Sequence, residues 1–132
     1  MSPKRVLVVE DDPGVRQFCV DALQGLGYAL VAVDDGSLAL QEIPRFQPDL
    51  ILLDLIMPRA RLDGVGLLSM LARGPACNIP VIILSAFGNA LAQEVSPDVT
   101  GALHIGAILS KPVSLDTLAR EVYRLIGPTV NN

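Results

Sequence analysis

The chain has 132 residues, carries a formal net charge of −4 and is 51% hydrophobic but only 4% aromatic. This length suits one domain with an aliphatic core, the acidic balance argues against direct nucleic-acid binding, and no apolar run is long enough to span a membrane. The two cysteines, Cys19 and Cys77, show neither metal-ligand spacing nor a disulfide pattern, so we expect a protein of the reducing cytoplasm.

The first part of the chain predicts a strand, a helix and a second strand. The apolar run at residues 6–9 reads as a strand, and the following Asp12 and Pro13 suit the N-cap and first position of a helix. That helix should end near Gly25, and Ala29–Val33 reads as the next strand. Apolar residues at helical spacing predict its buried face, which consists of Val15, Phe18, Cys19, Ala22 and Leu26.

The middle of the chain continues this alternation. A short helix is expected from Ser37 to about Ile43, and Pro44 should end it because proline clashes with a continuing helix. Residues 50–53 read as the third strand, and a third helix should begin near Gly64. Its inward residues are predicted to be Leu67, Leu68 and Leu71.

The fourth strand is predicted at residues 81–84, and the stretch after it is harder to interpret. Residues 87–104 start with a helical pattern near Ala90. Ser96-Pro97 should break that helix and leave residues 98–101 as a loop.

The last predicted elements are a strand at about residues 107–109 and a helix that Ser114 caps and Gly127-Pro128 ends. The inward face of this helix is predicted to consist of Leu115, Leu118, Ala119, Val122, Leu125 and Ile126. The strands are continuous runs of valine, isoleucine and leucine, which is typical of parallel strands covered on both faces. The whole pattern predicts an α/β fold with a doubly wound five-stranded parallel sheet and helices on both faces.

Polar residues of a particular kind follow four of these strands. Glu10 and Asp11 follow the first, Asp54 the third, Ser85 the fourth and Lys111 the fifth. Carboxyl ends of parallel strands meet at one edge of a sheet, so we expect these groups to converge. Two carboxylates about 5 Å apart repel by roughly 3 kcal/mol at an effective dielectric near 20. Three therefore need a proton, a cation or a lysine, and an oxygen-lined site of this kind favours Mg²⁺.

Taken singly, some of these residues have ordinary structural explanations. Asp12 is explained by helix capping alone, and Ser85 by itself would suit a helix cap or a turn. The joint arrangement is what favours a metal site that handles a phosphoryl group.

Five segments follow one another in a fixed order along the chain. They are Val8-Val9-Glu10-Asp11-Asp12-Pro13, Leu52-Leu53-Asp54-Leu55-Ile56-Met57-Pro58, Asp63-Gly64, Ile83-Leu84-Ser85-Ala86 and Lys111-Pro112. In this set, which includes an Asp-x-x-Met-Pro box, the chain resembles the response regulator receiver domains of two-component signalling. The resemblance covers almost the whole chain. It implies a flavodoxin-like strand order 2-1-3-4-5 and a single receiver domain over residues 1–132, with a core from about residue 4 to residue 127.

The resemblance also implies a magnesium cofactor and the residues that bind it. Asp11 and Asp54 would bind Mg²⁺ directly, Glu10 would act through a water molecule, and the backbone carbonyl of Ile56 would complete the site.

The same resemblance implies a phosphoacceptor signalling domain that is not a conventional enzyme. Asp54 would accept the phosphoryl group, and Ser85 and Lys111 would hold its oxygens. The donor would be a sensor histidine kinase or a histidine phosphotransfer protein. The product would lose its phosphate by self-catalysed hydrolysis. The downstream protein target is unknown, and the resemblance admits a phosphorylation-dependent dimer. We expect no membrane contact.

The chain departs from the receiver pattern in three places. Residues 59–62 form a longer link than usual and bring two arginines near the phosphorylation edge, either as a surface extension or as a contact for a partner or the phosphoryl group. The segment between Ser85 and Lys111 is also long. Ile108 occupies a switch position that is usually aromatic.

Three other functions compete with this interpretation. One is a receiver-like binding module that never takes phosphate, although the full set of site residues argues against it. Another is an aspartate-nucleophile phosphatase resembling haloacid dehalogenases, but Pro13 stands where its second aspartate belongs. The third is a phosphohistidine carrier that uses His104, which lacks a helical context. The length leaves no room for a DNA-binding output domain, so we expect a stand-alone receiver or part of a longer regulator or hybrid kinase.

Overall fold

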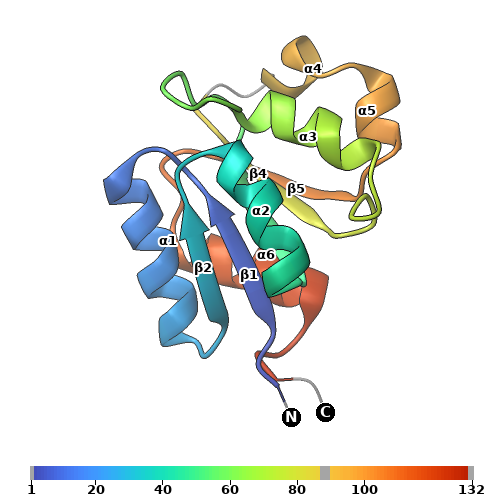
Figure 1. Ribbon diagram of the computed structural model, residues 1–132. Coiled ribbons are helices and arrows are strands. Elements are labelled where there is room, and N and C mark those ends of the chain that lie inside the picture. The colour runs from blue at the N-terminus through green and yellow to red at the C-terminus, as the bar shows by residue number, and fades with distance from the viewer. Residues whose placement is uncertain (1, 87–89, 131–132) are drawn as a thin grey trace.

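Five parallel strands form one sheet in the order β2-β1-β3-β4-β5 in the computed structural model, which describes residues 2–86 and 90–130 (Figure 1). The strands are β1 (Arg5–Val9), β2 (Ala29–Val33), β3 (Leu50–Asp54), β4 (Val81–Ser85) and β5 (Ile105–Ser110). The predicted fold class and strand order are confirmed. β5 extends beyond the predicted 107–109 at both ends.

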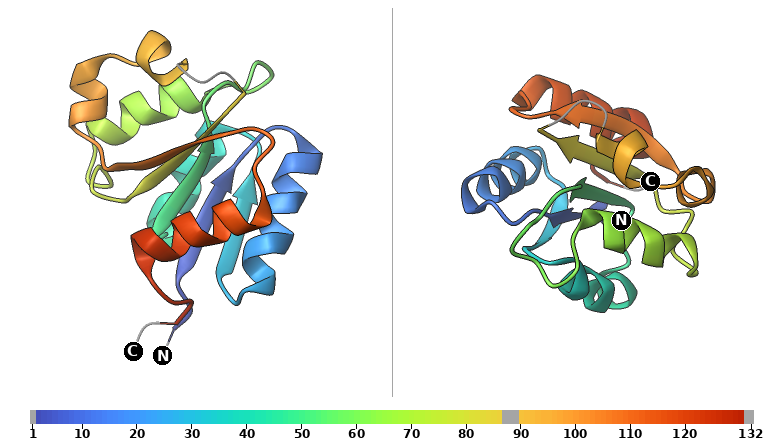
Figure 2. Two further views of the ribbon diagram at one scale, coloured as in Figure 1. Left: turned by 180° about the vertical axis from the view of Figure 1, so that it is seen from behind. Right: turned by 90° about the horizontal axis from the view of Figure 1, so that it is seen from above.

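Helices cover both faces of this sheet (Figure 2). Their bounds are α1 (Pro13–Gly25), α2 (Gly36–Phe46), α3 (Gly64–Ala72), α4 (Ala90–Glu94), α5 (Pro97–Gly101) and α6 (Leu115–Ile126). α1 and α6 lie on one face, and α2 to α5 lie on the other. Among the described residues, none of the helices combines the length and the apolar character that crossing a membrane would require.

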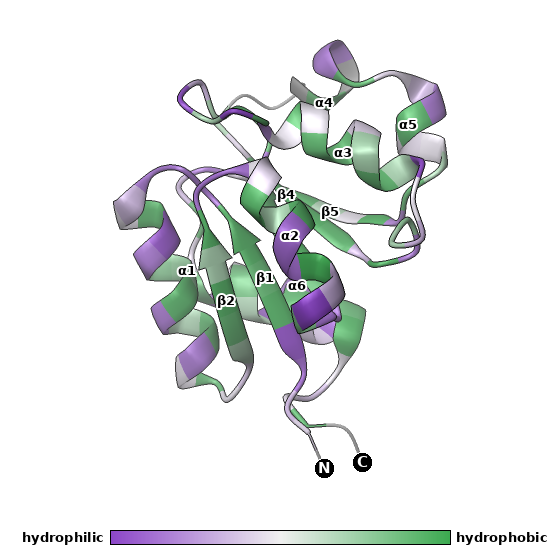
Figure 3. Cartoon of the chain, in the orientation of Figure 1, coloured by the Kyte–Doolittle hydropathy of each residue, from purple (hydrophilic) through white to green (hydrophobic). Residues whose placement is uncertain are grey.

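The alternation of side chains along the strands divides the core into two layers. Leu7, Ile51 and Ile83 point toward α2 and α3, where they meet buried residues such as Leu67. Neighbouring strand residues point the other way and pack against Cys19 and Leu23 of α1 and Leu118 and Val122 of α6, a set that includes Val6, Val8, Leu50, Leu52 and Ile82. The strands are mostly hydrophobic, apart from the hydrophilic start of β1, and much of the chain in the connections at their carboxyl ends is hydrophilic (Figure 3). Burial on both faces explains why these strands read as continuous aliphatic runs.

The predicted end of the second helix at Pro44 is wrong. α2 continues through this proline to Phe46, which packs against the core. Gln47 then adopts a left-handed conformation with φ 52° and its amide donates to the carbonyl of Ile43 at 2.9 Å. Packing of the last turn and this C-cap outweigh the hydrogen bond that proline cannot donate.

The predicted loop at residues 98–101 is also wrong, because these residues belong to the short helix α5. The expected break at Ser96-Pro97 does separate α4 from α5. Proline is well suited to the first turn of a helix, so Pro97 begins the second segment as well as closing off the first. Phe87 and its neighbours up to residue 89 lie outside the described residues.

Two predicted inward faces need correction. Phe18 and Leu26 of the α1 segment are 39% and 47% exposed, and Leu115 of α6 is 49% exposed. Phe18 precedes the fully buried Cys19 by one position, which is a rotation of about 100° around the helix. It therefore lies at the margin of the buried stripe, and Leu23, which the pattern did not single out, lies at its centre.

Candidate functional site

The polar residues singled out in the sequence lie at the carboxyl edge of the sheet. Glu10 and Asp11 directly follow β1, Asp54 ends β3, Ser85 ends β4 and Lys111 directly follows β5. The strands are in level register there. Val9 pairs with Leu53, Asp54 with Leu84, and Ser85 with Ser110. β1 lies between β2 and β3, which makes this edge the switch point where ligands bind in open α/β sheets.

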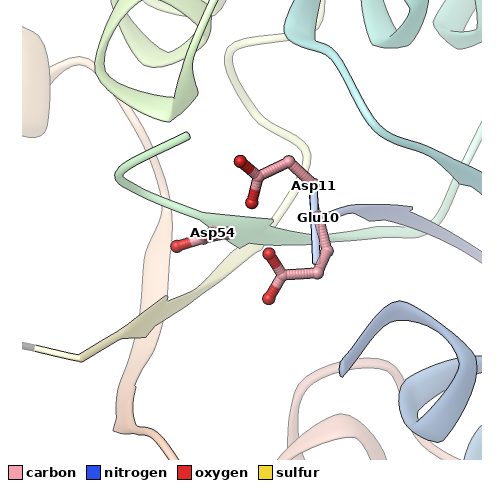
Figure 4. A group of neighbouring side chains, drawn as sticks. All are labelled: Glu10, Asp11 and Asp54. Atoms are coloured by element: carbon pink, nitrogen blue, oxygen red, sulfur yellow. The ribbon is translucent and has the colours of Figure 1, made fainter. Parts of the chain in front are cut away.

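Three carboxylates gather at this edge (Figure 4). Glu10, Asp11 and Asp54 each offer one oxygen, and these oxygens lie within 4.8 Å of one another. Glu10 is fully buried and Asp54 is 5% exposed, whereas Asp11 is partly exposed. Such a cluster carries more negative charge than a mostly buried site tolerates without a compensating cation or proton.

The turn from β1 into α1 fixes the first two of these carboxylates. The carboxylate of Asp12 accepts hydrogen bonds from the amides of Gly14 at 2.8 Å and Val15 at 3.1 Å, so this residue caps α1 as the sequence predicts. The guanidinium of Arg16 donates to the backbone carbonyl of Glu10 at 3.0 Å. These contacts hold the backbone, and Asp12 is occupied with capping instead of joining the cluster.

Lys111 supplies the positive charge of the site. Its ammonium lies 2.6 Å from Glu10 Oε1 and 3.2 Å from Asp54 Oδ2. Its own backbone amide donates to the carbonyl of Ser85 at 2.9 Å, which ties the residue to the end of β4. One ammonium among three carboxylates leaves the cluster negatively charged when all are ionised.

Burial and the neighbouring carboxylates shift the pKa values of the cluster. Burial, together with the hydrogen bond to Asp54, raises the pKa of Glu10 to about 7, although Lys111 acts in the opposite direction. Burial and the nearby Glu10 also raise the pKa of Asp11. Burial alone would lower the pKa of Lys111, but its contacts with Glu10 and Asp54 raise it overall. Without a metal, the cluster therefore favours holding an extra proton.

In metal-free buffer, the free energy of unfolding should fall as the pH rises from about 4.5 to about 7. The pKa of Glu10 is 4.5 ordinarily and about 7 in the folded chain, so the folded state binds more protons in this interval and loses that advantage as Glu10 ionises. The full shift corresponds to an upper bound of about 3 kcal/mol. Denaturant titrations across this range should show a flatter slope for Glu10→Gln than for wild type. Glu94→Gln, at an exposed position on α4, should keep the wild-type slope. Equal slopes in all three proteins would refute this account.

Ser85 and Ile56 also lie at the carboxyl edge of the sheet, at the end of β4 and just after β3. Ser85 is 3% exposed. The amide of Ile56 donates to Asp54 Oδ1 at 3.4 Å, which places the chain after β3 directly beside the carboxylate. The Ile56 side chain is 37% exposed. By contrast, His104 immediately precedes β5, and its carbonyl accepts from the amide of Val81 at 2.8 Å. It therefore lies at the opposite edge of the sheet, away from the carboxylates.

The donor set fits a hard divalent cation. Carboxylate oxygens are ligands that Mg²⁺ takes in proteins, usually together with several waters. Three carboxylates share one ammonium here, and a divalent cation would supply the missing positive charge.

A family model of the response regulator receiver domain matches residues 6–123 of the chain. The chain belongs to the response regulator receiver family. Among curated relatives, it is 32% identical over 137 residues to a probable transcriptional regulator, ycf27, of Porphyridium aerugineum, covering all of this chain and 53% of the relative. It is 35% identical over 127 residues to the response regulator MprA of Mycobacterium leprae (strain TN), covering 95% and 52%. The chain thus spans about half the length of the curated relatives it matches.

A solved receiver domain shows the same fold with a metal. The receiver domain of the sensor histidine kinase PA1611 from Pseudomonas aeruginosa PAO1 has a TM-score of 0.78 and 29% identity to this chain, covering 96% of this chain and 99% of that one. That structure has a magnesium ion coordinated in its active site cleft. The family consists of signalling domains of two-component systems, as the resemblance implied. The acidic cluster of this receiver could likewise hold a metal.

One set of contacts was not predicted from the sequence. Asp35 caps α2 and also accepts hydrogen bonds from the amides of Arg61 and Leu62, 26 and 27 residues away. Asp35-Gly36 before a helix indicates only a cap, and no periodic pattern reports a contact over that distance.

Proposed function

We propose that this receiver takes a phosphoryl group onto Asp54 in a Mg²⁺-dependent reaction and signals by a change of conformation. The observation that carries the proposal is the position of Asp54, which is nearly buried at the end of β3, in contact with Lys111 and clustered with Glu10 and Asp11. A carboxylate held in this way is available for attack on a phosphorus atom that approaches from the carboxyl edge of the sheet.

The reaction is a displacement at phosphorus. A carboxylate oxygen of Asp54 forms the new bond, while the bond from phosphorus to the donor's histidine nitrogen breaks and that nitrogen keeps the electron pair and takes up a proton. Phosphoryl transfer depends on positioning and on neutralising charge. The ammonium of Lys111, now shared between Glu10 and Asp54, would turn to the transferred oxygens. The hydroxyl of Ser85 would donate to another of them from the end of β4.

Asp11, Asp54 and the carbonyl of Ile56 would bind Mg²⁺, with Glu10 acting through a water molecule. When bound, the ion would neutralise negative charge on the transferring group. Glu10 and Asp11 would then lose the excess protons that the metal-free cluster favours, because a divalent cation replaces the missing positive charge.

The signal would be read on the face that α4, β5 and α6 share. Movement of Ser85 toward the phosphoryl group would bias the neighbouring β5, which pairs with β4 along its length. Ile108 of β5 is 48% exposed and has no hydroxyl, so it cannot alternate between two polar partners as a tyrosine can. A downstream protein, or a second phosphorylated copy, would bind this face.

We also propose that residues 1–132 form one receiver domain, with a core from about residue 4 to residue 127, and that this domain acts in the cytoplasm. Cys19 and Cys77 are both free, which suits a reducing compartment. The phosphoryl donor would be a sensor histidine kinase or a histidine phosphotransfer protein, and the chain would act as a signalling domain without a separate substrate.

The direct test is incubation with acetyl phosphate and Mg²⁺, followed by measurement of the intact mass. The chain should gain one phosphoryl group, and chelation of Mg²⁺ should prevent this. A chain that stays unmodified at saturating donor would overturn the proposal.

The donor protein should dock in an apolar groove beside Lys111. The groove has a volume of about 310 Å³ and is lined by Gly14, Val15, Phe18, Lys111, Pro112 and Val113. Phe18→Ala should slow transfer from a phosphorylated histidine phosphotransfer protein by about tenfold or more, since losing a large buried contact at an interface costs over 1 kcal/mol. Transfer from acetyl phosphate, which needs no docking surface, should be unchanged.

Leu38→Ala is the matched control for this variant. Leu38 lies on α2 and is 41% exposed, close to the 39% of Phe18. Both transfer rates should stay at the wild-type level in this control. If Phe18→Ala slowed the two donors equally, the groove would affect the site itself and the docking interpretation would fail.

A further inference from the structure

The connection from β3 to α3 is fastened to the start of α2. This loop projects from the carboxyl edge of the sheet (Figure 1) and contains the two arginines of the unusually long link. The carboxylate of Asp35 accepts from the amide of Arg61 at 2.7 Å and from the amide of Leu62 at 3.1 Å. In return, the amide of Gly36 donates to the carbonyl of Leu62 at 2.7 Å. We call these three hydrogen bonds the Asp35 clasp.

Asp35 is fully engaged in this arrangement. Its Oδ1 also accepts from the amide of Ser37 at 2.9 Å and from the Ser37 hydroxyl at 2.8 Å. Partial burial acts against ionisation, but the hydrogen bonds from Ser37, Arg61 and Leu62 lower the pKa of Asp35 to about 2. The carboxylate of Asp35 therefore stays ionised at neutral pH, as an acceptor of four hydrogen bonds must be.

Two glycines leave the space that the clasp needs. A Cβ at Gly36 would lie 2.6 Å from the carbonyl oxygen of Leu62, and a Cβ at Gly66 would lie 2.5 Å from Leu62 Cδ1. Any larger residue at Gly36 would push the backbone of Leu62 away. The absence of a side chain at Gly36 of α2 and at Gly66 of α3 thus allows Leu62 to approach both helices closely.

The loop that the clasp holds begins at the candidate metal site. Its first residues are tied to β3, because the amide of Ile56 donates to Asp54 Oδ1 at 3.4 Å. A turn follows, with the amide of Ala60 donating to the carbonyl of Met57 at 3.1 Å. The next two residues carry the clasp. The backbone of Ile56 therefore lies between Leu55, whose carbonyl accepts from the amide of Val65 at 3.2 Å, and the turn that the Asp35 clasp holds.

We propose that Asp35 is a positioning residue for the metal site: by clasping Arg61 and Leu62 it holds the backbone carbonyl of Ile56 where Mg²⁺ needs it. Asp35 contacts no reacting group itself. The inference rests on the proposed function, because it assumes that Ile56 supplies a ligand to Mg²⁺. It assigns the long link a structural task at the site, in addition to any contact that its arginines make.

The test separates the clasp from the helix cap. Serine is a good N-cap but its side chain is too short to reach the loop, so Asp35→Ser should keep α2 folded while it removes both side-chain hydrogen bonds to the amides of Arg61 and Leu62. The backbone hydrogen bond from Gly36 to Leu62 should remain. Mg²⁺ affinity, measured by calorimetry without any donor, should fall by about tenfold, as when other outer contacts of metal ligands are removed. Amide hydrogen exchange at residues 61 and 62 should accelerate. Asp35→Asn, which keeps the Oδ1 acceptor, should recover part of the affinity.

The outcomes distinguish this inference from the proposed function. If the wild type is phosphorylated on Asp54 and Asp35→Ser binds Mg²⁺ as tightly as wild type, then Asp35 is only a helix cap and the inference fails alone. If Asp35→Ser weakens Mg²⁺ binding but exchange at residues 61 and 62 is unchanged, the clasp is not the cause and the inference also fails. A wild-type chain that neither binds Mg²⁺ nor gains a phosphoryl group would overturn both proposals.

Discussion

Replacing Asp54 with Asn should abolish phosphorylation of the chain by acetyl phosphate and Mg²⁺. Asn has nearly the same shape, but its amide oxygen is a poor nucleophile and it carries no charge to attract Lys111, which lies 3.2 Å from Asp54 Oδ2. Intact-mass measurement should show complete modification of wild type at saturating donor and none of the variant.

Asp12→Asn is the matched control for this experiment. Asp12 is also an aspartate and lies only two residues from Glu10, but it is exposed and caps α1, a role that asparagine fills equally well. It should therefore be phosphorylated like wild type. An adduct that persists in Asp54→Asn would show that another carboxylate accepts the phosphoryl group and would refute the assignment.

The local features of this site could be predicted from sequence because they depend on where strands end. A run of buried aliphatic residues followed by Asp54, or by Glu10 and Asp11, identifies a strand and the polar group at its carboxyl end without any knowledge of the neighbours. The order of the strands could not be predicted in this way. Nothing in the residues themselves determines that β1 lies between β2 and β3, and that expectation came from the resemblance to receiver domains.

The errors share a physical cause, which is that local rules were applied where tertiary packing decides. Pro44 ends a helix by its propensity, yet the partly buried Phe46, which packs against the core, and the C-cap at Gln47 extend α2 past it. Phe18 fits an apolar stripe by spacing, but the sheet covers only the Cys19 side of α1. The Asp35 clasp joins residues 26 and 27 positions apart through backbone amides, so no side-chain pattern could reveal it.

The charge balance of the cluster connects stability with function. A site suited to a dication carries more negative charge than is favourable in the metal-free fold. In this chain, the ammonium of Lys111 offsets part of that charge. Glu10 and Asp11 are therefore expected to cost stability until the metal binds, as is common where a functional site stores strain.

Asp11→Ala should stabilise the metal-free chain and remove its stabilisation by Mg²⁺. The pKa of Asp11 is raised by burial and by Glu10, so its charge is unfavourable where it stands. Coulomb's law gives a repulsion of about 1–3 kcal/mol for carboxylates at this spacing, and the partial exposure of Asp11 places the gain near the lower end. Wild type should gain about 2.7 kcal/mol from Mg²⁺ at 100 times its dissociation constant, and the variant should gain almost nothing.

Denaturant titrations with a chelator and with excess Mg²⁺ measure both effects, and Asp12→Ala provides the contrast. Removing the α1 cap should cost about 1 kcal/mol and leave the response to Mg²⁺ intact. Adjacent aspartates should thus change the stability of the metal-free chain in opposite directions. If Asp11→Ala is instead destabilised like the cap variant, then the carboxylates do not repel as their spacing requires. If the variant still responds to Mg²⁺, then Asp11 is not a metal ligand.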